Sequence, residues 1–172
     1  MKCKVCDMLQ ARKGMIYEDD KVAAFLSEHP ATIGHIILAP KEHFPIFENV
    51  PDFLVSHMFM VANKLSTACF DAIGAQGTNI LVNNGIEAGQ ADPHFIINIV
   101  PRREEDGINL QWEPRQVSEE ELSRLELQIK EQSEAVGDFE KEKSAPVNMD
   151  KDTEKIEEDE DNYLLKSLDR IP

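Results

Sequence analysis

Basic residues, cysteines and long apolar runs are all scarce in this sequence of 172 residues. Lys and Arg total 18 against 33 Asp and Glu, so the formal net charge is -15 and a nucleic-acid backbone would meet a like-charged surface. No window approaches the roughly 18 apolar residues of a membrane-spanning helix, and the first ten residues carry charges in place of an apolar signal region. We therefore expect no nucleic-acid partner, no membrane insertion and a cytoplasmic location.

The three cysteines make an odd count that does not suit a disulfide framework. Cys3 and Cys6 are separated by two residues, a spacing that suits either a zinc site or a redox pair. Redox pairs of the thioredoxin type follow a strand in a βαβ unit, which this sequence does not indicate, so a metal is favoured. The spacing alone does not choose its other ligands among the five histidines, which are His29, His35, His43, His57 and His94.

Apolar periodicity in residues 1–117 predicts an α+β domain. After a short cysteine-bearing helix, three strands, one long amphipathic helix and two further strands follow one another, and the helix is expected to end near Gly74. This order favours a mainly antiparallel sheet with the long helix packed on one face, over a repeating βαβ plan. The predicted strands cover 15–20, 21–28, 34–43, 78–84 and 94–101, and the long helix covers 52–75.

The rest of the chain differs in composition from this domain. Residues 118–172 hold 18 Asp and Glu against 8 Lys and Arg, which is two-thirds of the net charge. A helix is predicted over 118–136, where Ser118 and Glu121 have the form of a capping box. Residues 137–172 are predicted to form an acidic, largely disordered tail because they offer little apolar surface to bury. Its apolar end, from Tyr163 to Ile171, suits either a docking peptide or a self-packing terminus.

Two stretches, 34–44 and 79–102, together resemble the signature of the histidine triad (HIT) family. The family pairs a strand of the form G-H-x-L-V-x-P-K-x-H with a later N-x-G-x-x-A/G-G-Q loop. That loop leads into a strand reading H-x-H-x-H, often followed by Pro-Arg. The resemblance runs from about Cys3 to Trp112, so it implies a HIT-like fold for 1–117 and does not cover the tail.

The resemblance also implies a ligand set for zinc. In zinc-bearing relatives the ion is held by an amino-terminal C-x-x-C, the P-K-x-H histidine and the first triad histidine. These correspond to Cys3, Cys6, His43 and His94. Four protein ligands leave no open position, so the zinc would be structural and would pin the amino-terminal helix onto the sheet. The alternative is that the four residues are buried and metal-free.

The catalytic part of the signature is degenerate. Family members attack the α-phosphorus of a nucleotide with the middle histidine, and that position is Ile96. The third triad position is Asn98, whose amide does not titrate near neutrality. We therefore expect no covalent catalysis by the family route and assign no catalytic residue. His35 matches a family active-site histidine and is a possible catalytic remnant.

The resemblance implies that part of the nucleotide site is retained. Ala91 lacks the hydroxyl that relatives usually offer to phosphate, and Asp92 adds a negative charge nearby. An alternative is that the loop persists only because its tight turn needs glycine and asparagine. The residues expected to contact base, ribose or phosphate are Phe25, Leu26, Ser27, Asn83, Gly89, Gln90 and Asn98.

Three functions remain in competition. The favoured one is a zinc-stabilised pseudoenzyme that binds a purine nucleotide or acts as a scaffold. The second is a hydrolase or transferase that acts on AMP conjugates or dinucleoside polyphosphates by a non-covalent route. The third is an interaction module that binds a protein partner through its acidic tail. By analogy with the family, we also expect a homodimer.

Overall fold

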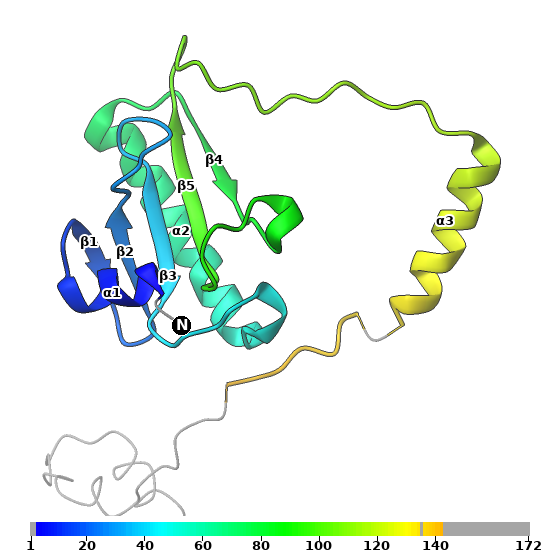
Figure 1. Ribbon diagram of the computed structural model, residues 1–172, viewed down its shortest axis with the longest axis horizontal. Coiled ribbons are helices and arrows are strands. Elements are labelled where there is room, and N and C mark those ends of the chain that lie inside the picture. The colour runs from blue at the N-terminus through cyan, green and yellow to red at the C-terminus, as the bar shows by residue number, and fades with distance from the viewer. Residues whose placement is uncertain (1–2, 135, 143–172) are drawn as a thin grey trace, which may run out of the picture. The chain divides into compact units, whose positions relative to one another are not determined.

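The computed structural model describes residues 3–134 and 136–142, and its centre is one antiparallel sheet of five strands (Figure 1). The strands lie in the order β1-β2-β3-β5-β4, and every neighbouring pair is antiparallel. The α+β fold with a mainly antiparallel sheet is therefore confirmed. The strands are β1 (Met15–Glu18), β2 (Val22–Leu26), β3 (Ile36–Pro40), β4 (Gly77–Leu81) and β5 (Ile97–Arg102).

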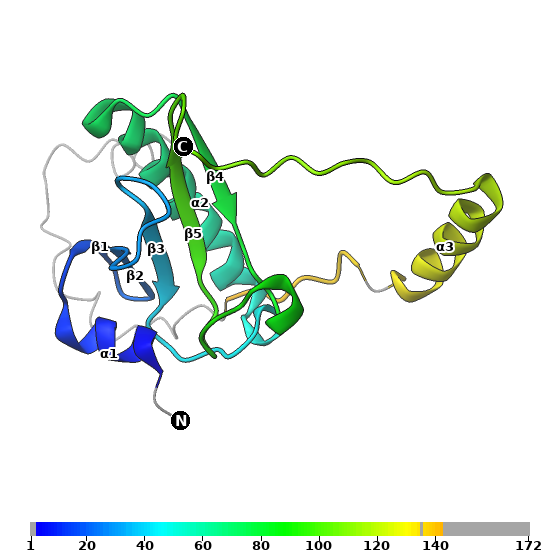
Figure 2. The ribbon, with the colours of Figure 1, turned by 45° about the horizontal axis from the view of Figure 1, so that its top comes forward.

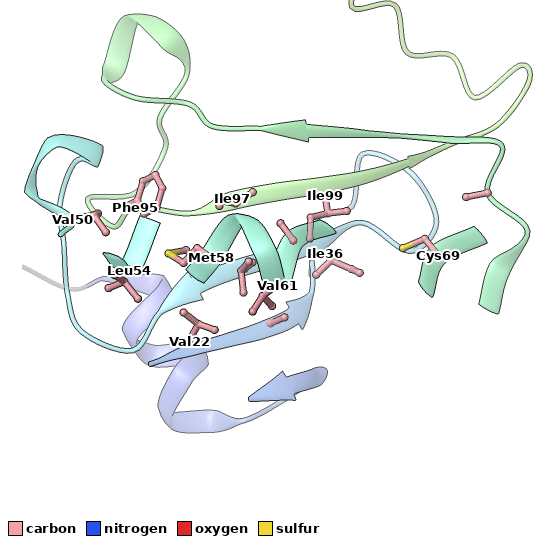
Figure 3. Packing of buried hydrophobic residues seen from close by; sticks show 14 residues of the cluster. Val22, Ile36, Val50, Leu54, Met58, Val61, Cys69, Phe95, Ile97 and Ile99 are labelled. Carbon is pink, nitrogen blue, oxygen red and sulfur yellow. The ribbon is translucent and has the colours of Figure 1, made fainter. Parts of the chain in front are cut away.

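The long helix α2 (Asp52–Ile73) covers one face of the sheet. It ends at Gly74, whose positive φ of 64° is the left-handed conformation that glycine adopts without steric cost. Its apolar residues recur at helical spacing, so one side of the helix is buried against the strands. Figure 3 shows Leu54, Met58 and Val61 of α2 facing Ile36, Ile97 and Ile99 of the sheet.

The opposite face of the sheet receives the short helix α1 (Lys4–Ala11), as Figures 1 and 2 show from two directions. Side chains alternate between the two faces of a strand, so Leu38 packs toward α2 while its neighbour Ala39 packs toward α1. The cluster on this second face is small and is formed by Cys3, Val5 and Ala39, with Cys6, Leu9 and Ile96 packed against it. Two hydrophobic clusters of unequal size thus sandwich the sheet.

The last strand is shorter at its start than the sequence predicts. It was expected from position 94, but β5 begins at Ile97. The reason is that the Phe95 N–H donates to the carbonyl oxygen of Phe44, 2.6 Å away, outside any strand pairing. The preceding loop contains a single 3-10 turn, η2 (Ile86–Ala88), and another, η1 (Phe47–Asn49), precedes α2.

A third helix, α3 (Glu119–Gln132), lies near the carboxy-terminal end of the described chain. Ser118 caps it, because the Glu121 N–H donates to Ser118 Oγ at 3.3 Å. None of its residues is buried. The predicted disordered tail covers 137–172, and all of it after residue 142 lies outside the described residues. The predicted docking segment from Tyr163 to Ile171 lies outside them as well.

Among the helices that the structure describes, none combines the length and the apolar character needed to span a membrane.

A carboxylate at the turn between β1 and β2 ties that hairpin to α2. Asp19 Oδ1 accepts from the backbone N–H groups of Lys21 and Val22, both at 2.8 Å. Its Oδ2 accepts from Tyr17 Oη at 2.8 Å and lies 2.7 Å from His57 Nε2 of α2. Burial alone would raise the pKa of Asp19, but these four hydrogen bonds outweigh it and hold the pKa well below its usual range.

The low pKa of Asp19 predicts a specific dependence of stability on pH. A depressed pKa in the folded state contributes stability that is complete above the unfolded pKa of about 3.9 and is lost as the pH falls below it. We expect Asp19→Ala to lower the free energy of unfolding by about 1–3 kcal/mol at pH 7. The deficit relative to wild type should shrink between pH 4 and pH 2 in urea titrations. Asp71→Ala, at an exposed position of α2, is the control and should change little; a deficit for Asp19→Ala that did not vary with pH would contradict the assignment.

Candidate functional site

Two cysteines and two histidines from separate parts of the chain converge beside the sheet. Cys3 directly precedes α1 and Cys6 lies in its first turn, whereas His43 follows β3 and His94 lies just before β5. One ligand atom from each residue lies within 4.8 Å of all the others. These are the four residues that the HIT resemblance assigned to a metal, and the structure brings all four together. The group could hold a metal ion.

The spacing of these atoms fits a tetrahedral ion. Bonds of about 2.3 Å from zinc to sulfur and about 2.05 Å from zinc to nitrogen place sulfur and nitrogen ligands about 3.6 Å apart. Here Cys3 Sγ lies 3.4 Å and Cys6 Sγ lies 3.5 Å from His94 Nδ1, and Cys6 Sγ lies 3.3 Å from His43 Nδ1. Two thiolates and two imidazoles are also the donor set of closed structural zinc sites.

The environment of His94 prepares its imidazole for a metal. Its Nε2 lies 3.1 Å from the carbonyl oxygen of Pro40, which can only accept, so Nε2 carries the proton and Nδ1 is left with a free lone pair. Nδ1 is the nitrogen that faces the two sulfurs. Burial lowers the pKa of His94, which favours the neutral, metal-binding form at pH 7.

A cleft of about 530 Å³ lies between α1 and the same face of the sheet. We call it the α1 cleft. Its volume falls in the range of small-molecule sites, which is about 300–1,000 Å³. Most of the charged residues in its lining are exposed, and we call the charged residues its rim. The residues used below are Val5, Met8, Ser27, His35, Ile96 and Asn98.

Ile96, which the HIT resemblance places at the middle triad position, has a packing role. It lines the α1 cleft and also packs against the small cluster that contains Val5 and Ala39. An aliphatic side chain here contributes to holding α1 on the sheet, and it has no atom that can attack phosphorus. Asn98, two residues further on, points to the same cleft because side chains alternate along the strand.

The hydrogen bonds of His35 fix its tautomer. Its Nδ1 accepts from the Ala31 N–H at 3.2 Å, so the proton of the neutral ring is on Nε2. That Nε2 lies 3.1 Å from Asn98 Oδ1, which therefore accepts from it. Burial is the main cause that lowers the pKa of His35. With both ring nitrogens engaged, His35 is poorly placed to accept a further proton.

Only some of the residues predicted to bind nucleotide line the α1 cleft. Ser27 and Asn98 line the α1 cleft, but its lining includes neither Phe25, which is fully buried, nor Leu26, which is 46% exposed. In the loop before β5, Gln90 Nε2 donates to the carbonyl oxygens of Pro45 and Asp92 at 2.7 and 3.0 Å, and Gln90 Oε1 accepts from the Gly85 N–H at 2.9 Å.

The remaining two loop residues also interact with each other. Asn83 Nδ2 donates to the Gly89 carbonyl oxygen at 3.3 Å. Gly89 has a φ of 84°, and an added Cβ would lie 3.4 Å from the Asn83 amide nitrogen, so both backbone strain and space favour glycine there. Ligand contacts by Asn83, Gly89 and Gln90 stay predictions.

Sequence reasoning missed that α1 forms a wall of the cleft. Met8 and Val5 line the cleft from the helix side, and Lys4 and Lys13 flank its opening. The apolar spacing of Val5, Met8 and Leu9 was the available signal, because residues three and four apart share one face of a helix. Eight residues are too few for that signal to be distinct.

Comparison with known proteins agrees with this geometry. The family model of the HIT domain matches residues 9–105, which is more than half of the chain. The adenylylsulfatase HINT3 of Arabidopsis thaliana is 36% identical over 106 residues, which cover 60% of this chain and 54% of that protein. This chain therefore spans about half the length of that relative.

Solved structures show the same fold. A HIT family protein from Bacillus subtilis superposes with a TM-score of 0.70 at 29% identity, over 76% of this chain and 96% of that one. A zinc-bound histidine triad family protein from Mycobacterium smegmatis gives a TM-score of 0.60 at 28% identity, over 77% and 98% of the two chains. Domain match, sequence identity and fold agree, and the chain belongs to the histidine triad (HIT) family.

Proposed function

We propose that this chain is a zinc-stabilised HIT-fold protein that binds a purine nucleotide in the α1 cleft without the covalent turnover of its family. The observation that carries the proposal is Ile96, which fills the position of the nucleophile and packs against α1. The cleft beside it has the size of a ligand site and offers hydrogen-bonding groups from Ser27 and Asn98. A binding site that lacks its nucleophile suits a pseudoenzyme.

Zinc is the metal that we propose for the Cys3, Cys6, His43 and His94 group. Support comes from the two thiolates, from the sulfur-to-nitrogen distances of 3.3–3.5 Å and from the zinc-bound relative. The ion would supply a cross-link and no reaction chemistry, because four protein ligands close its coordination. The role of the chain's own residues is to hold α1 against the sheet and so to form the wall of the cleft.

Loss of one ligand should remove the metal. We expect about one zinc per chain in the wild-type protein and far less in Cys6→Ala, because the three remaining ligands would bind zinc weakly. The free energy of unfolding should fall by about 2–3 kcal/mol, as for a ligand present at about 100 times its Kd. Elemental analysis by mass spectrometry and urea titration measure the two effects. Cys69→Ala is the matched control, since Cys69 lies on the buried face of α2 and is not one of the four ligands; this variant should keep its zinc. Full zinc content in Cys6→Ala would refute the ligand assignment.

Binding without turnover is the second expected behaviour. Calorimetric titration of the zinc-loaded protein with AMP should show saturable binding that Asn98→Ala weakens by about 5- to 10-fold, the equivalent of one lost hydrogen bond. Intact-mass spectra after incubation with adenosine phosphoramidate should show no nucleotidyl adduct, because no imidazole stands at position 96. Ser56→Ala, on α2 and outside the cleft, is the control for the Asn98 change.

Two outcomes would redirect this proposal. Turnover of adenosine phosphoramidate or of diadenosine tetraphosphate would favour the second candidate, a hydrolase or transferase that works by a non-covalent route. The engagement of both His35 nitrogens weighs against that candidate, because it leaves no free general base at this residue. Absence of any nucleotide binding would remove the sensing part of the proposal and leave a scaffold.

A role as an interaction module is supported by α3. One side of this helix carries Leu122, Leu125 and Ile129, which are 54%, 40% and 67% exposed. Apolar side chains at helical spacing gain stability when a partner covers them. Affinity capture with the full chain and with a chain ending at 117 tests this role, and equal capture by both would exclude it for 118–172.

We also propose a homodimer. Phe59 and Phe70 on α2 and Ile80 on the edge strand β4 are exposed apolar residues that a second copy could cover. Light scattering at micromolar concentration measures the mass, and a monomer would contradict this part.

A further inference from the structure

The rim of the α1 cleft carries an excess of negative charge. Lys4 and Lys13 supply two positive charges to the lining, whereas Asp7, Glu28 and Asp92 supply three negative ones. Both lysines already face carboxylates, with Nζ to carboxylate-oxygen distances of 4.0 Å for Lys4 to Asp92 and 3.0 Å for Lys13 to Glu28. Both lysine side chains are 81% exposed, so these ion pairs are weak. A phosphate that bound either lysine would still have the carboxylate of that pair beside it. The lining therefore gives an anion no net attraction.

The loop before β5 offers few free donors to a phosphate. Both N–H groups of the Gln90 amide are used by the carbonyl oxygens of Pro45 and Asp92, and its oxygen is used by the Gly85 N–H. Ala91 at the cleft edge has no hydroxyl. A phosphate in this position would have to break hydrogen bonds that hold the loop together, at the cost of leaving polar groups unpaired.

The donors that remain in the cleft are neutral. Because His35 Nε2 donates to Asn98 Oδ1, the Asn98 amide is oriented with its oxygen toward His35 and its NH2 group is available to a ligand. The Ser27 oxygen accepts from the His29 N–H at 3.2 Å, so the Ser27 hydroxyl hydrogen is also available. Neutral donors of this kind suit the ring nitrogens of a base or the oxygens of a ribose.

Apolar side chains surround these donors. Val5 and Met8 of α1 line the cleft together with Ile37 of β3 and Ile96, which lies just before β5. Flat, partly apolar molecules gain from burial between such walls, whereas a charged group loses its hydration there. The interior of the cleft thus matches a nucleoside better than it matches a polyphosphate.

We infer that the α1 cleft recognises the uncharged nucleoside part of a purine ligand and disfavours phosphate, so that affinity falls with each phosphate added. This inference rests on the proposed function, because both require a purine ligand in the cleft. It reverses the usual expectation for a nucleotide site, in which phosphate contacts supply much of the attraction.

Paired titrations of the zinc-loaded full chain test the order of affinities. Adenosine and guanosine should bind at least about threefold more tightly than AMP and GMP at low salt, and ADP should bind more weakly still, as expected for added like charge near an exposed rim. Raising the salt from about 50 to 500 mM should narrow the difference, because exposed charges are screened. Glu28→Gln should improve AMP binding relative to adenosine, whereas Asp71→Asn on α2 should leave the ratio unchanged.

The outcomes separate this inference from the proposed function. AMP that bound as tightly as adenosine, or more tightly, would overturn the preference for nucleosides and leave nucleotide binding intact. Binding of neither adenosine nor AMP up to millimolar concentration would remove the proposed purine site and the inference with it. Tighter binding of adenosine, with a salt-dependent gap, would support both.

Discussion

The meeting of Cys3, Cys6, His43 and His94 is the contact on which the cleft depends. Helix α1 has only eight residues and no side-chain hydrogen bond at its N-cap, and so short a helix is marginal without tertiary support. Its apolar support is the small cluster around Val5. Four ligand atoms from the chain's beginning and two later segments lie within 4.8 Å of one another, where a bound metal would cross-link them. A metal bound there would hold α1 against the sheet, and α1 forms one wall of the α1 cleft.

The segment around β5 shows how one stretch of chain serves three different partners. The Nδ1 of His94 faces the two sulfurs, Ile96 packs against the cluster that contains Val5 of α1, and Asn98 accepts a hydrogen bond from His35. Between them, Ile97 and Ile99 point to the α2 side and complete the main core. Because side chains alternate between the two faces of a strand, the residues that face the cleft can vary in type while those that face α2 stay apolar. Isoleucine at 96 and asparagine at 98 are therefore compatible with an intact core, and Ile96 contributes a packing contact.

Much of this arrangement could be predicted from the sequence, because the signals were local. The helical spacing of Leu54, Met58 and Val61 predicted α2, and alternation predicted the five strands. Spacing could not choose His43 and His94 among five histidines, since ligands from distant segments meet only in the folded chain; the family signature made that choice. Nor could it show that the Gln90 amide turns inward to Pro45 and Asp92, because a side-chain direction depends on partners far away in sequence.

The central claim is that the metal ligands hold α1 on the sheet, and hydrogen exchange of the full chain tests it most directly. After zinc is removed with a chelator, amides of residues 7–11 should exchange at least about tenfold faster, because the helix loses its cross-link. Amides of residues 56–70 in α2 should keep their protection. Unchanged protection of α1 without metal, or equal loss in both helices, would contradict the account.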